Sequence, residues 1–278
     1  MELWFSEYHL PGLRYSLKVK NFLYTGQSKY QRLDFFETYE FGKVFTLDGI
    51  VMLTEKDEFV YHEMMAHLPS LVHPAPKRAL VIGGGDGGTI RELLKHESYE
   101  SLDLCEIDKE VVDKCKIYFP ETASKLDDPK VNLYFEDGIK FVQNKKNYYD
   151  IICVDSTDPI GPAVGLFKED FYRMCYDALT DDGILIAQSE SIWYHGDIIK
   201  EVNKAFKKIF PEVKLAVASL ICYQSGFWSF TLGSKKYNLL TDIDENRAKR
   251  IEATCKYYNL DIHKSCFYLP NFAKEFVK

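Results

Sequence analysis

The sequence predicts an α/β protein in which a small N-terminal antiparallel β-domain precedes a mostly parallel sheet. Two patterns support this fold class. Residues 1–55 alternate between apolar and polar side chains with a period of about two, and residues 78–235 alternate between strand-like and helix-like segments. Strands that are separated by helices pair in parallel and carry helices on both faces of their sheet. We therefore expect two domains, residues 1–55 and residues 56–278.

The N-terminal segment contains alternating runs that are rich in Tyr, Phe and Thr, at residues 15–28, 31–41 and 42–54. Turn residues such as Asp48 and Gly49 separate or interrupt these runs. Strands joined by short glycine-containing turns form antiparallel hairpins. An exposed edge of such a sheet can pair with a second chain.

A helix is predicted after this sheet, because Phe59, Met64, Met65 and Leu68 recur at helical spacing before Pro74. Strands are then expected at residues 78–84, 101–108, 131–137, 149–156, 183–190, 213–220 and 227–235. Helices are expected at residues 87–96, 109–119, 138–145, 168–180 and 195–210. Sheets of this kind bind ligands beyond the carboxyl ends of their strands.

Composition excludes several classes of function. The chain has 278 residues, of which 46% are apolar, and a net charge of −7, so neither nucleic acid nor an anionic membrane is an expected partner. Seven cysteines without a C-x-x-C spacing predict reduced, buried thiols rather than disulfides or a zinc site. The sequence has no signal-peptide pattern and no run of about 18 apolar residues. These features predict a cytoplasmic protein.

The stretch GGGDGG, residues 83–88, joins a predicted strand to a predicted helix. Glycines there let the backbone turn tightly and approach a ligand closely. A pyrophosphate is a poor ligand for this turn, because the Asp86 carboxylate would repel it by several kcal/mol where solvation is weak. A cationic nucleoside, such as an adenosine sulfonium that carries an amine, fits the turn better.

Two further acids lie at the same edge of the predicted sheet. Glu106 ends the second parallel strand, where an acidic side chain accepts hydrogen bonds from ribose hydroxyls in folds of this kind. Asp137 and Gly138 follow the third strand, and Asp137 can accept a hydrogen bond from an adenine amino group. Two structural alternatives stay open: Glu106 as a solvated strand end, and Asp137 as a helix N-cap.

The fourth strand leads into DSTDPIGP, residues 155–162, in which two prolines and a glycine predict a loop. Asp155 and Asp158 would face a cationic nucleoside, an arrangement that suits an amine as the second substrate. An alkylamine has a pKa of about 10, so a base must remove its proton as it attacks. We predict that Asp155 is this base; the alternative is a turn cap without chemistry.

These segments resemble the polyamine aminopropyltransferases, most closely the bacterial spermidine synthases. The resemblance covers nearly the whole chain and rests on several motifs in order: YQRLDFFE, LDGIVMLTEKDEFVYHEMMAHLP, VIGGGDGGTIRELLKH, CEID, EDG, VDSTDPIGPA, AQSES and SGFWSFTLGSKKY. It implies a Rossmann-like, methyltransferase-type catalytic domain. It also implies transfer of an aminopropyl group from decarboxylated S-adenosylmethionine to putrescine, giving spermidine and methylthioadenosine.

The resemblance also assigns residues. The expected contacts to the nucleoside donor are Gln31, Glu106, Asp137, Gly138 and Pro162. The expected contacts to the amines are His62, Asp86 and Asp158, with Tyr61 lining the channel and Asp155 as the proton acceptor. Gln188, which ends the fifth parallel strand at the rim, and Tyr223, in the segment that borders the amine pocket, are further candidates for amine contact. No metal and no prosthetic group are expected, since a sulfonium is already an activated leaving group. The resemblance further implies a homodimer or homotetramer acting on a small diamine.

One segment departs from the family pattern. The family has Pro-Thr-Tyr-Pro-Ser-Gly before its last strand, whereas residues 221–226 read ICYQSG, so Gln224 replaces a proline. Because this segment borders the amine pocket in the family, agmatine, cadaverine or a triamine stay open as acceptors.

Three other functions stay open. They are an amine N-methyltransferase that uses S-adenosylmethionine, a catalytically silent partner subunit, and a nicotinamide-dependent dehydrogenase. Asp86 favours aminopropyl transfer over methyl transfer, since it would repel the donor's carboxylate and attract its ammonium group.

Overall fold

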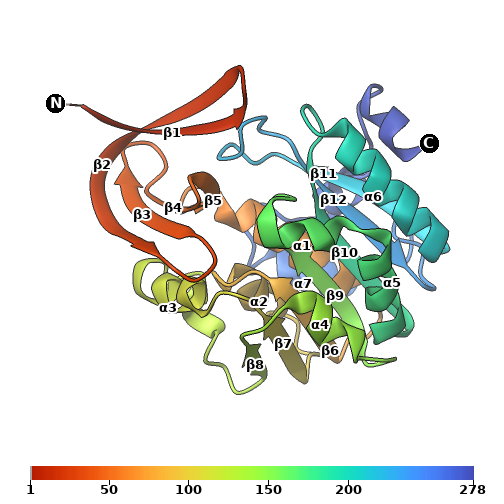
Figure 1. Cartoon of the computed structure of the whole chain (residues 1–278). Helices are drawn as coiled ribbons and strands as arrows, with labels where there is room; N and C mark the ends of the chain where they lie inside the picture. The colour runs from red at the N-terminus through yellow and green to blue at the C-terminus, as the bar shows by residue number, and fades with distance from the viewer. Residues whose placement is uncertain (1) are drawn as a thin grey trace.

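The computed structural model describes residues 2–278, except for the side chains of His9 and Pro162. Its N-terminal part is a five-stranded antiparallel sheet in the order β1-β2-β3-β4-β5 (Figure 1). The strands are β1 (Leu3–Leu10), β2 (Leu13–Gln27), β3 (Arg32–Thr38), β4 (Lys43–Leu47) and β5 (Ile50–Thr54). The predicted antiparallel sheet is therefore confirmed. Strand β1 was not predicted, and it forms the edge beside β2.

The second sheet has seven strands in the order β11-β12-β10-β9-β6-β7-β8. Its five parallel strands are β6 (Arg78–Gly83), β7 (Ser101–Cys105), β8 (Val131–Tyr134), β9 (Tyr149–Asp155) and β10 (Leu179–Ser191). At one edge, β12 (Trp228–Ser234) runs antiparallel to both of its neighbours, β10 and the edge strand β11 (Glu212–Ala218). The strand order reverses on either side of β6, which makes the ends of β6 and β9 the expected place for a ligand.

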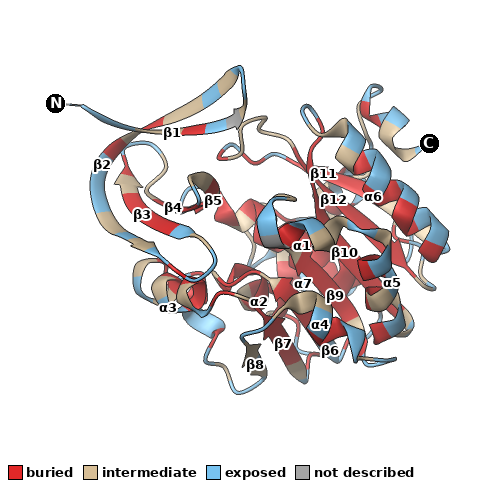
Figure 2. Cartoon of the chain, in the orientation of Figure 1, coloured by how far each residue is buried: buried red, intermediate tan, exposed pale blue. Residues whose placement is uncertain are grey.

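Helices cover both faces of this sheet (Figure 2). The side chains along each strand point alternately to one face and the other. In β6, Ala79 and Val81 belong to one core cluster, whereas Leu80 and Ile82 belong to the other. The helices are α1 (Glu58–Val72), α2 (Gly88–Leu93), α3 (Lys109–Tyr118), α4 (Gly138–Gln143), α5 (Glu169–Ala178) and α6 (Gly196–Ile209). Helices α1, α2 and α3 pack in the first cluster, and α4, α5 and α6 in the second. The mostly parallel α/β sheet is confirmed.

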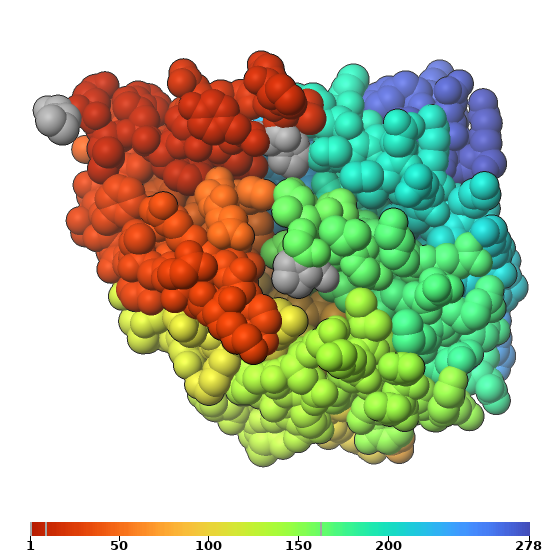
Figure 3. Space-filling model, in the orientation of Figure 1, coloured from red at the N-terminus to blue at the C-terminus, as the bar shows by residue number. Residues whose placement is uncertain are grey.

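The N-terminal sheet packs directly on the rest of the chain. The ring of Phe35 in β3 lies 5.0 Å from Tyr118 and 6.0 Å from Phe119 at the end of α3, measured between centroids. Three residues separate the end of β5 from the start of α1, which is buried along nearly its whole length. Figure 3 shows the N-terminal sheet, in red and orange, beside the green segment that follows β9.

The sequence did not predict several short elements. These are α7 (Glu245–Glu252), α8 (Leu260–Ser265) and the 3-10 helices η1 (Ala123–Lys125), η2 (Gly161–Phe167) and η3 (Ala273–Val277). The loop prediction for residues 155–162 is wrong at its end, since η2 begins at Gly161 with a proline in its first turn, where proline is tolerated. Among the described residues, no helix is long and apolar enough to cross a membrane.

Candidate active site

A cavity of about 210 Å³ lies at the carboxyl ends of β6, β7 and β9, between the two sheets. The N-terminal sheet and α1 complete its wall. Ten of the predicted site residues line it: Gln31, Tyr61, His62, Asp86, Glu106, Asp137, Gly138, Asp155, Asp158 and Tyr223. Its floor therefore combines acidic groups with the glycine-rich turn at residues 83–88.

The turn brings two strand ends together. Gly83 and Gly84 have φ of 80° and 66°, values in the left-handed region that favours glycine. The amide of Gly84 donates to the carbonyl oxygen of Asp155 at 2.9 Å, and a Cβ on Gly83 would lie only 2.1 Å from that oxygen. The glycines thus let β6 and the end of β9 touch. As a result, a ring nitrogen of His62 and one carboxylate oxygen each of Asp86 and Asp155 all lie within 4.8 Å of one another.

Asp155 is a buried carboxylate with two hydroxyl partners. The hydroxyl of Thr89 donates to its Oδ2 at 2.6 Å, and the Tyr61 hydroxyl also donates to it. Burial, together with the negative charge of Asp86, raises the pKa of Asp155 to about 6. At neutral pH this group is mostly ionised, yet it binds a proton more readily than an exposed aspartate does.

His62 links Asp86 to a second acidic group. Its Nε2 lies 3.1 Å from Asp86 Oδ1, and its Nδ1 lies 2.6 Å from Glu58 Oε2. Burial opposes a charge on His62, but the two carboxylates outweigh it, so the pKa of His62 stands well above its ordinary value. Burial also opposes ionisation of Asp86, and His62 reverses the effect, so the pKa of Asp86 is lowered. The side chain of His62 is buried, with 3% of its surface exposed.

Arg91 extends this network on its outer side. Its guanidinium binds Glu58 through two hydrogen bonds, of 3.1 Å and 2.9 Å, and binds Glu92 through Nε at 2.8 Å. Such a two-point contact fixes the direction of the carboxylate. Neither Glu58 nor Arg91, nor Thr89 beside Asp155, was predicted from the sequence. The i, i+4 spacing of Glu58 and His62 on one helix was the available signal for that pair.

Glu106 and Asp137 lie on the opposite side of the glycine-rich turn. Burial raises the pKa of Glu106 to about 7, and its Oε1 accepts a hydrogen bond of 2.9 Å from the amide of Asp108. The alternative of a solvated strand end is therefore wrong for Glu106. Asp137 accepts from the amide of Ile139 at 2.9 Å and caps α4, as its structural alternative predicted. Its other oxygen stays available for a ligand, since a carboxylate offers several lone pairs.

The remaining predicted residues differ in their positions. Gln31 donates through Nε2 to Asp108 at 3.1 Å while lining the cavity. Gln188 lines a second, smaller cavity rather than the main one, and it donates to the carbonyl oxygens of Ser156 and Thr157 at 3.3 and 3.4 Å. The predicted contact of Pro162 lies outside the described side chains.

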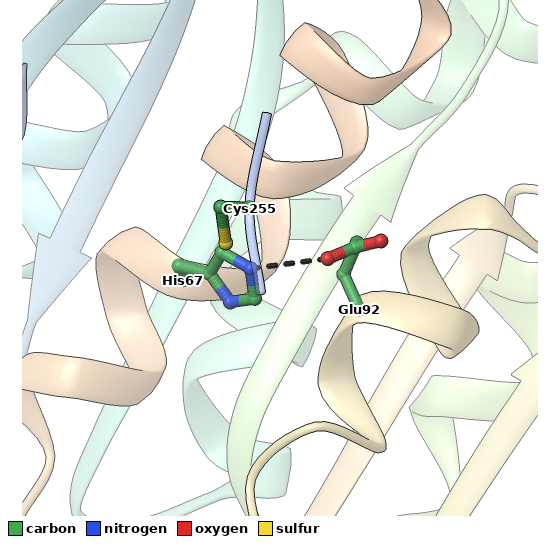
Figure 4. A group of neighbouring side chains, drawn as sticks. All are labelled: His67, Glu92 and Cys255. Atoms are coloured by element: carbon green, nitrogen blue, oxygen red, sulfur yellow. Dashed lines mark hydrogen bonds and ion pairs between the residues drawn. The ribbon is translucent and has the colours of Figure 1, made fainter. Parts of the chain in front are cut away.

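A cluster behind the active site also has the residue types of a metal site. His67, Glu92 and Cys255 place ligand atoms within 4.8 Å of one another, and His67 Nε2 lies 3.1 Å from Glu92 Oε2 (Figure 4). Glu92 is already paired with Lys95 at 2.5 Å and with Arg91 at 2.8 Å. Two cations therefore balance this carboxylate, and a metal ion would have to displace them. The prediction that the protein needs no metal stays a prediction.

Fold and site together define an α/β enzyme that binds its ligands in an acidic cavity at the ends of parallel strands. Residues 58–245 match the spermine/spermidine synthase domain, and residues 3–55 match the spermidine synthase tetramerisation domain. The chain belongs to the spermine/spermidine synthase family, and it is a transferase.

Named relatives cover the whole chain. It is 51% identical to the polyamine aminopropyltransferase of Alkaliphilus oremlandii and 50% identical to that of Clostridium perfringens, over 100% of this chain and 99% of each relative. A spermidine synthase solved with the transition-state analogue AdoDATO superposes with a TM-score of 0.97 at 42% identity, covering 99% of this chain and 94% of that one. The spermidine synthase of Thermotoga maritima superposes with a TM-score of 0.94 at 41% identity, again covering 99% of this chain and 94% of that one.

Proposed function

We propose that the protein transfers the aminopropyl group of decarboxylated S-adenosylmethionine to putrescine, giving spermidine and methylthioadenosine. The names of the relatives support the reaction type, and the AdoDATO complex of a similar protein supports a nucleoside donor. No prosthetic group takes part in this reaction, since the donor carries its own leaving group. The acceptor is a small diamine.

The donor fits the half of the cavity that contains Glu106 and Asp137. Glu106 would accept hydrogen bonds from the ribose hydroxyls, and Asp137 with Gly138 would contact the adenine. Gln31 and Pro162 would complete this half. A Cβ on Gly85 would lie 3.0 Å from Glu106 Cγ, so a glycine at position 85 leaves the backbone open toward the nucleoside.

The acidic half would hold the amines. Asp86 would attract the ammonium of the aminopropyl chain, with His62 fixing the direction of its carboxylate at 3.1 Å. Asp158, Gln188 and Tyr223 would line the path of the acceptor, together with Tyr61. In this arrangement the acceptor nitrogen lies between the Asp155 carboxylate and the sulfonium carbon.

The reaction is then a direct displacement. The acceptor nitrogen forms a bond to the methylene carbon beside the sulfonium, and the carbon–sulfur bond breaks with its electron pair going to sulfur. Methylthioadenosine leaves as a neutral thioether. The nitrogen loses its proton to the Asp155 carboxylate, which can accept it because its pKa is about 6. This buried carboxylate, held by Thr89 and Tyr61, is the observation that carries the proposal.

A product assay tests the proposal. The purified protein is incubated with putrescine and either decarboxylated S-adenosylmethionine or S-adenosylmethionine, and the products are identified by mass spectrometry. We expect spermidine from the decarboxylated donor only. A methylated amine from S-adenosylmethionine would instead establish the N-methyltransferase alternative, and NAD binding by calorimetry would favour the dehydrogenase.

We also propose a homodimer or homotetramer assembled through the N-terminal domain, with a domain division at residues 1–55 and 56–278. Edge strand β1 and its neighbour β2 expose the large apolar side chains of Leu3, Trp4, Tyr8 and Phe22. Exposed apolar groups on a sheet edge are typical of interfaces between chains. Light scattering on the purified protein measures the assembly, and a Trp4→Glu variant should weaken it. The cytoplasmic location stays a prediction.

A further inference from the structure

A second cavity of about 30 Å³ continues the acidic half of the active site toward strand β1. Tyr61, Asp158 and Tyr223 line both cavities, so the two share a wall. Glu7 of β1, Gln188 of β10, Gln224 and Trp228 line the second cavity but not the main one. An extended acceptor whose reacting nitrogen lies at Asp155 would point its far end in this direction.

Gln224 stands out in the wall of this cavity. Neither its amide oxygen nor its amide nitrogen has a hydrogen-bond partner in the described part of the chain, although both atoms are shielded from solvent. The indole nitrogen of Trp228 and the hydroxyl of Ser156, in the same wall, are also unpartnered among the described residues. Buried polar groups are usually satisfied, by protein, water or ligand. Three such side chains around one small cavity indicate a polar occupant.

The backbone on both sides of Gln224 is held in place. The Tyr223 hydroxyl donates to the carbonyl oxygen of Met52 at 2.8 Å, and the amide of Cys222 donates to Asp57 Oδ2 at 2.8 Å. The amide of Gly226 closes the turn by donating to the carbonyl oxygen of Tyr223 at 2.8 Å. The Gln224 amide is therefore presented by a fixed turn rather than by a free loop.

The chemistry of the wall defines what can occupy the cavity. Glu7 is 5% exposed and its carboxylate accepts from the amide of Val51 at 3.2 Å, so negative charge lies on the far side of the cavity. An ammonium group is a donor only, and it suits a wall that offers a carboxylate and an amide oxygen. The volume fits an ammonium group and one water, whereas a planar guanidinium would bring five donors to a wall that offers few acceptors.

We infer that Gln224 determines acceptor specificity: its Oε1 accepts a hydrogen bond from the far ammonium group of a diamine, while a water receives the donors of Gln224 Nε2 and Trp228 Nε1. The inference rests on the proposed function and narrows it, because it selects ammonium-terminated acceptors over guanidinium-terminated ones such as agmatine. A residue without a polar side chain at position 224 could not make this contact.

The test compares two acceptors that differ only at the far end, putrescine and n-butylamine. For Gln224→Leu, we expect the ratio of kcat/KM for putrescine to that for n-butylamine to fall about 10-fold, the loss typical of one hydrogen bond to a charged group. The matched control is Gln143→Leu, the same change at the exposed end of α4, which should leave the ratio unchanged. Calorimetry of methylthioadenosine binding checks that the donor half of each variant is intact.

The outcomes distinguish a failure of the role of Gln224 from a failure of the proposed function. An unchanged ratio in Gln224→Leu, whether both rates fall together or neither falls, would overturn the role of Gln224. Agmatine used by the wild-type protein as well as putrescine would overturn the preference for an ammonium group. If the wild-type protein alkylated no amine at all, the proposed function itself would fail, and the inference with it.

Discussion

Glu58 Oε2 lies 2.6 Å from Nδ1 of His62, one turn later on α1, and this contact keeps a buried histidine beside the active-site carboxylates. His62 in turn holds Asp86 at 3.1 Å, and Arg91 holds Glu58 from behind. The charge around Asp86 and Asp155, in the proposed amine site, therefore depends on Glu58 and Arg91, which do not contact these aspartates directly. The contact between Glu58 and His62 gives the first prediction.

Replacing Glu58 by Gln should lower the pKa of His62. The substitution removes a charged hydrogen-bond partner that stabilises the protonated form of the imidazole. Titration of the His62 ring by NMR, in protein labelled at histidine, measures the shift. Glu97→Gln, at an exposed position, is the control and should leave the titration unchanged. A His62 pKa equal to that of the wild type in Glu58→Gln would show that Glu58 does not hold the proton.

The turnover of the enzyme should depend on the protonation of Asp155. Because its pKa is raised to about 6, the carboxylate is available above pH 6 and is protonated below it, so kcat should fall as the pH drops through 6. Asp155→Asn should lower kcat by about 10²-fold or more and remove this limb of the pH profile. Asp113→Asn, at an exposed helix position, serves as control. Full turnover in Asp155→Asn would refute the role of Asp155 as the base.

Gly88→Ala should disrupt the amine site directly. A Cβ at this position would lie 2.2 Å from His62 Nδ1, which is too close for any real contact, so the imidazole must move away from Glu58 and Asp86. We expect a loss of about 1–3 kcal/mol in the free energy of unfolding, measured with urea, and a higher KM for the amine. Gly12→Ala is the matched control, because no described atom outside its chain neighbours lies within 4 Å of a Cβ at this position. Equal stability of the two variants would show that His62 has room to shift.

His263 should make the protein less stable in acid. Burial lowers the pKa of His263 from its ordinary value of 6.5 to about 3, so between these values the unfolded chain binds a proton that the folded chain does not. The free energy of unfolding should therefore fall, as the pH drops from 6.5, by up to about 1.4 kcal/mol per pH unit from this group. Urea denaturation at pH 7 and pH 5 measures the difference, and His263→Gln should reduce it. An unchanged pH dependence in that variant would contradict this account.

The sequence predicted the parallel sheet and its helices because apolar periodicity is local. It could not show that Arg91 meets Glu58, or that Thr89 meets Asp155, since these contacts join separate elements. Strand β1 was missed because its sequence, LWFSEYHL, does not alternate strictly between apolar and polar side chains, and α7 and α8 because their helical faces carry few apolar residues. Gln188 was predicted to contact the amine from its place at a strand end; its side chain lines the second cavity, and the amine contact stays a prediction.

For Asp86, the sequence predicted the position of the side chain at the strand ends, and its cationic ligand stays a prediction. A carboxylate in a glycine-rich turn implied a cationic ligand, and the structure places Asp86 in the same cavity as Asp155 and Glu106. The sequence alone did not show that His62 already pairs with Asp86. That pairing depends on α1 crossing the glycine-rich turn, where a side chain on Gly88 would collide with the imidazole ring.

The most direct test of the proposed reaction is the identity of the product formed from putrescine and decarboxylated S-adenosylmethionine by the purified wild-type protein. The account predicts one spermidine and one methylthioadenosine for each donor consumed, with Asp155→Asn forming both at a rate lower by about 10²-fold or more. Consumption of the donor without an aminopropylated amine, or equal rates in the wild type and the variant, would contradict it.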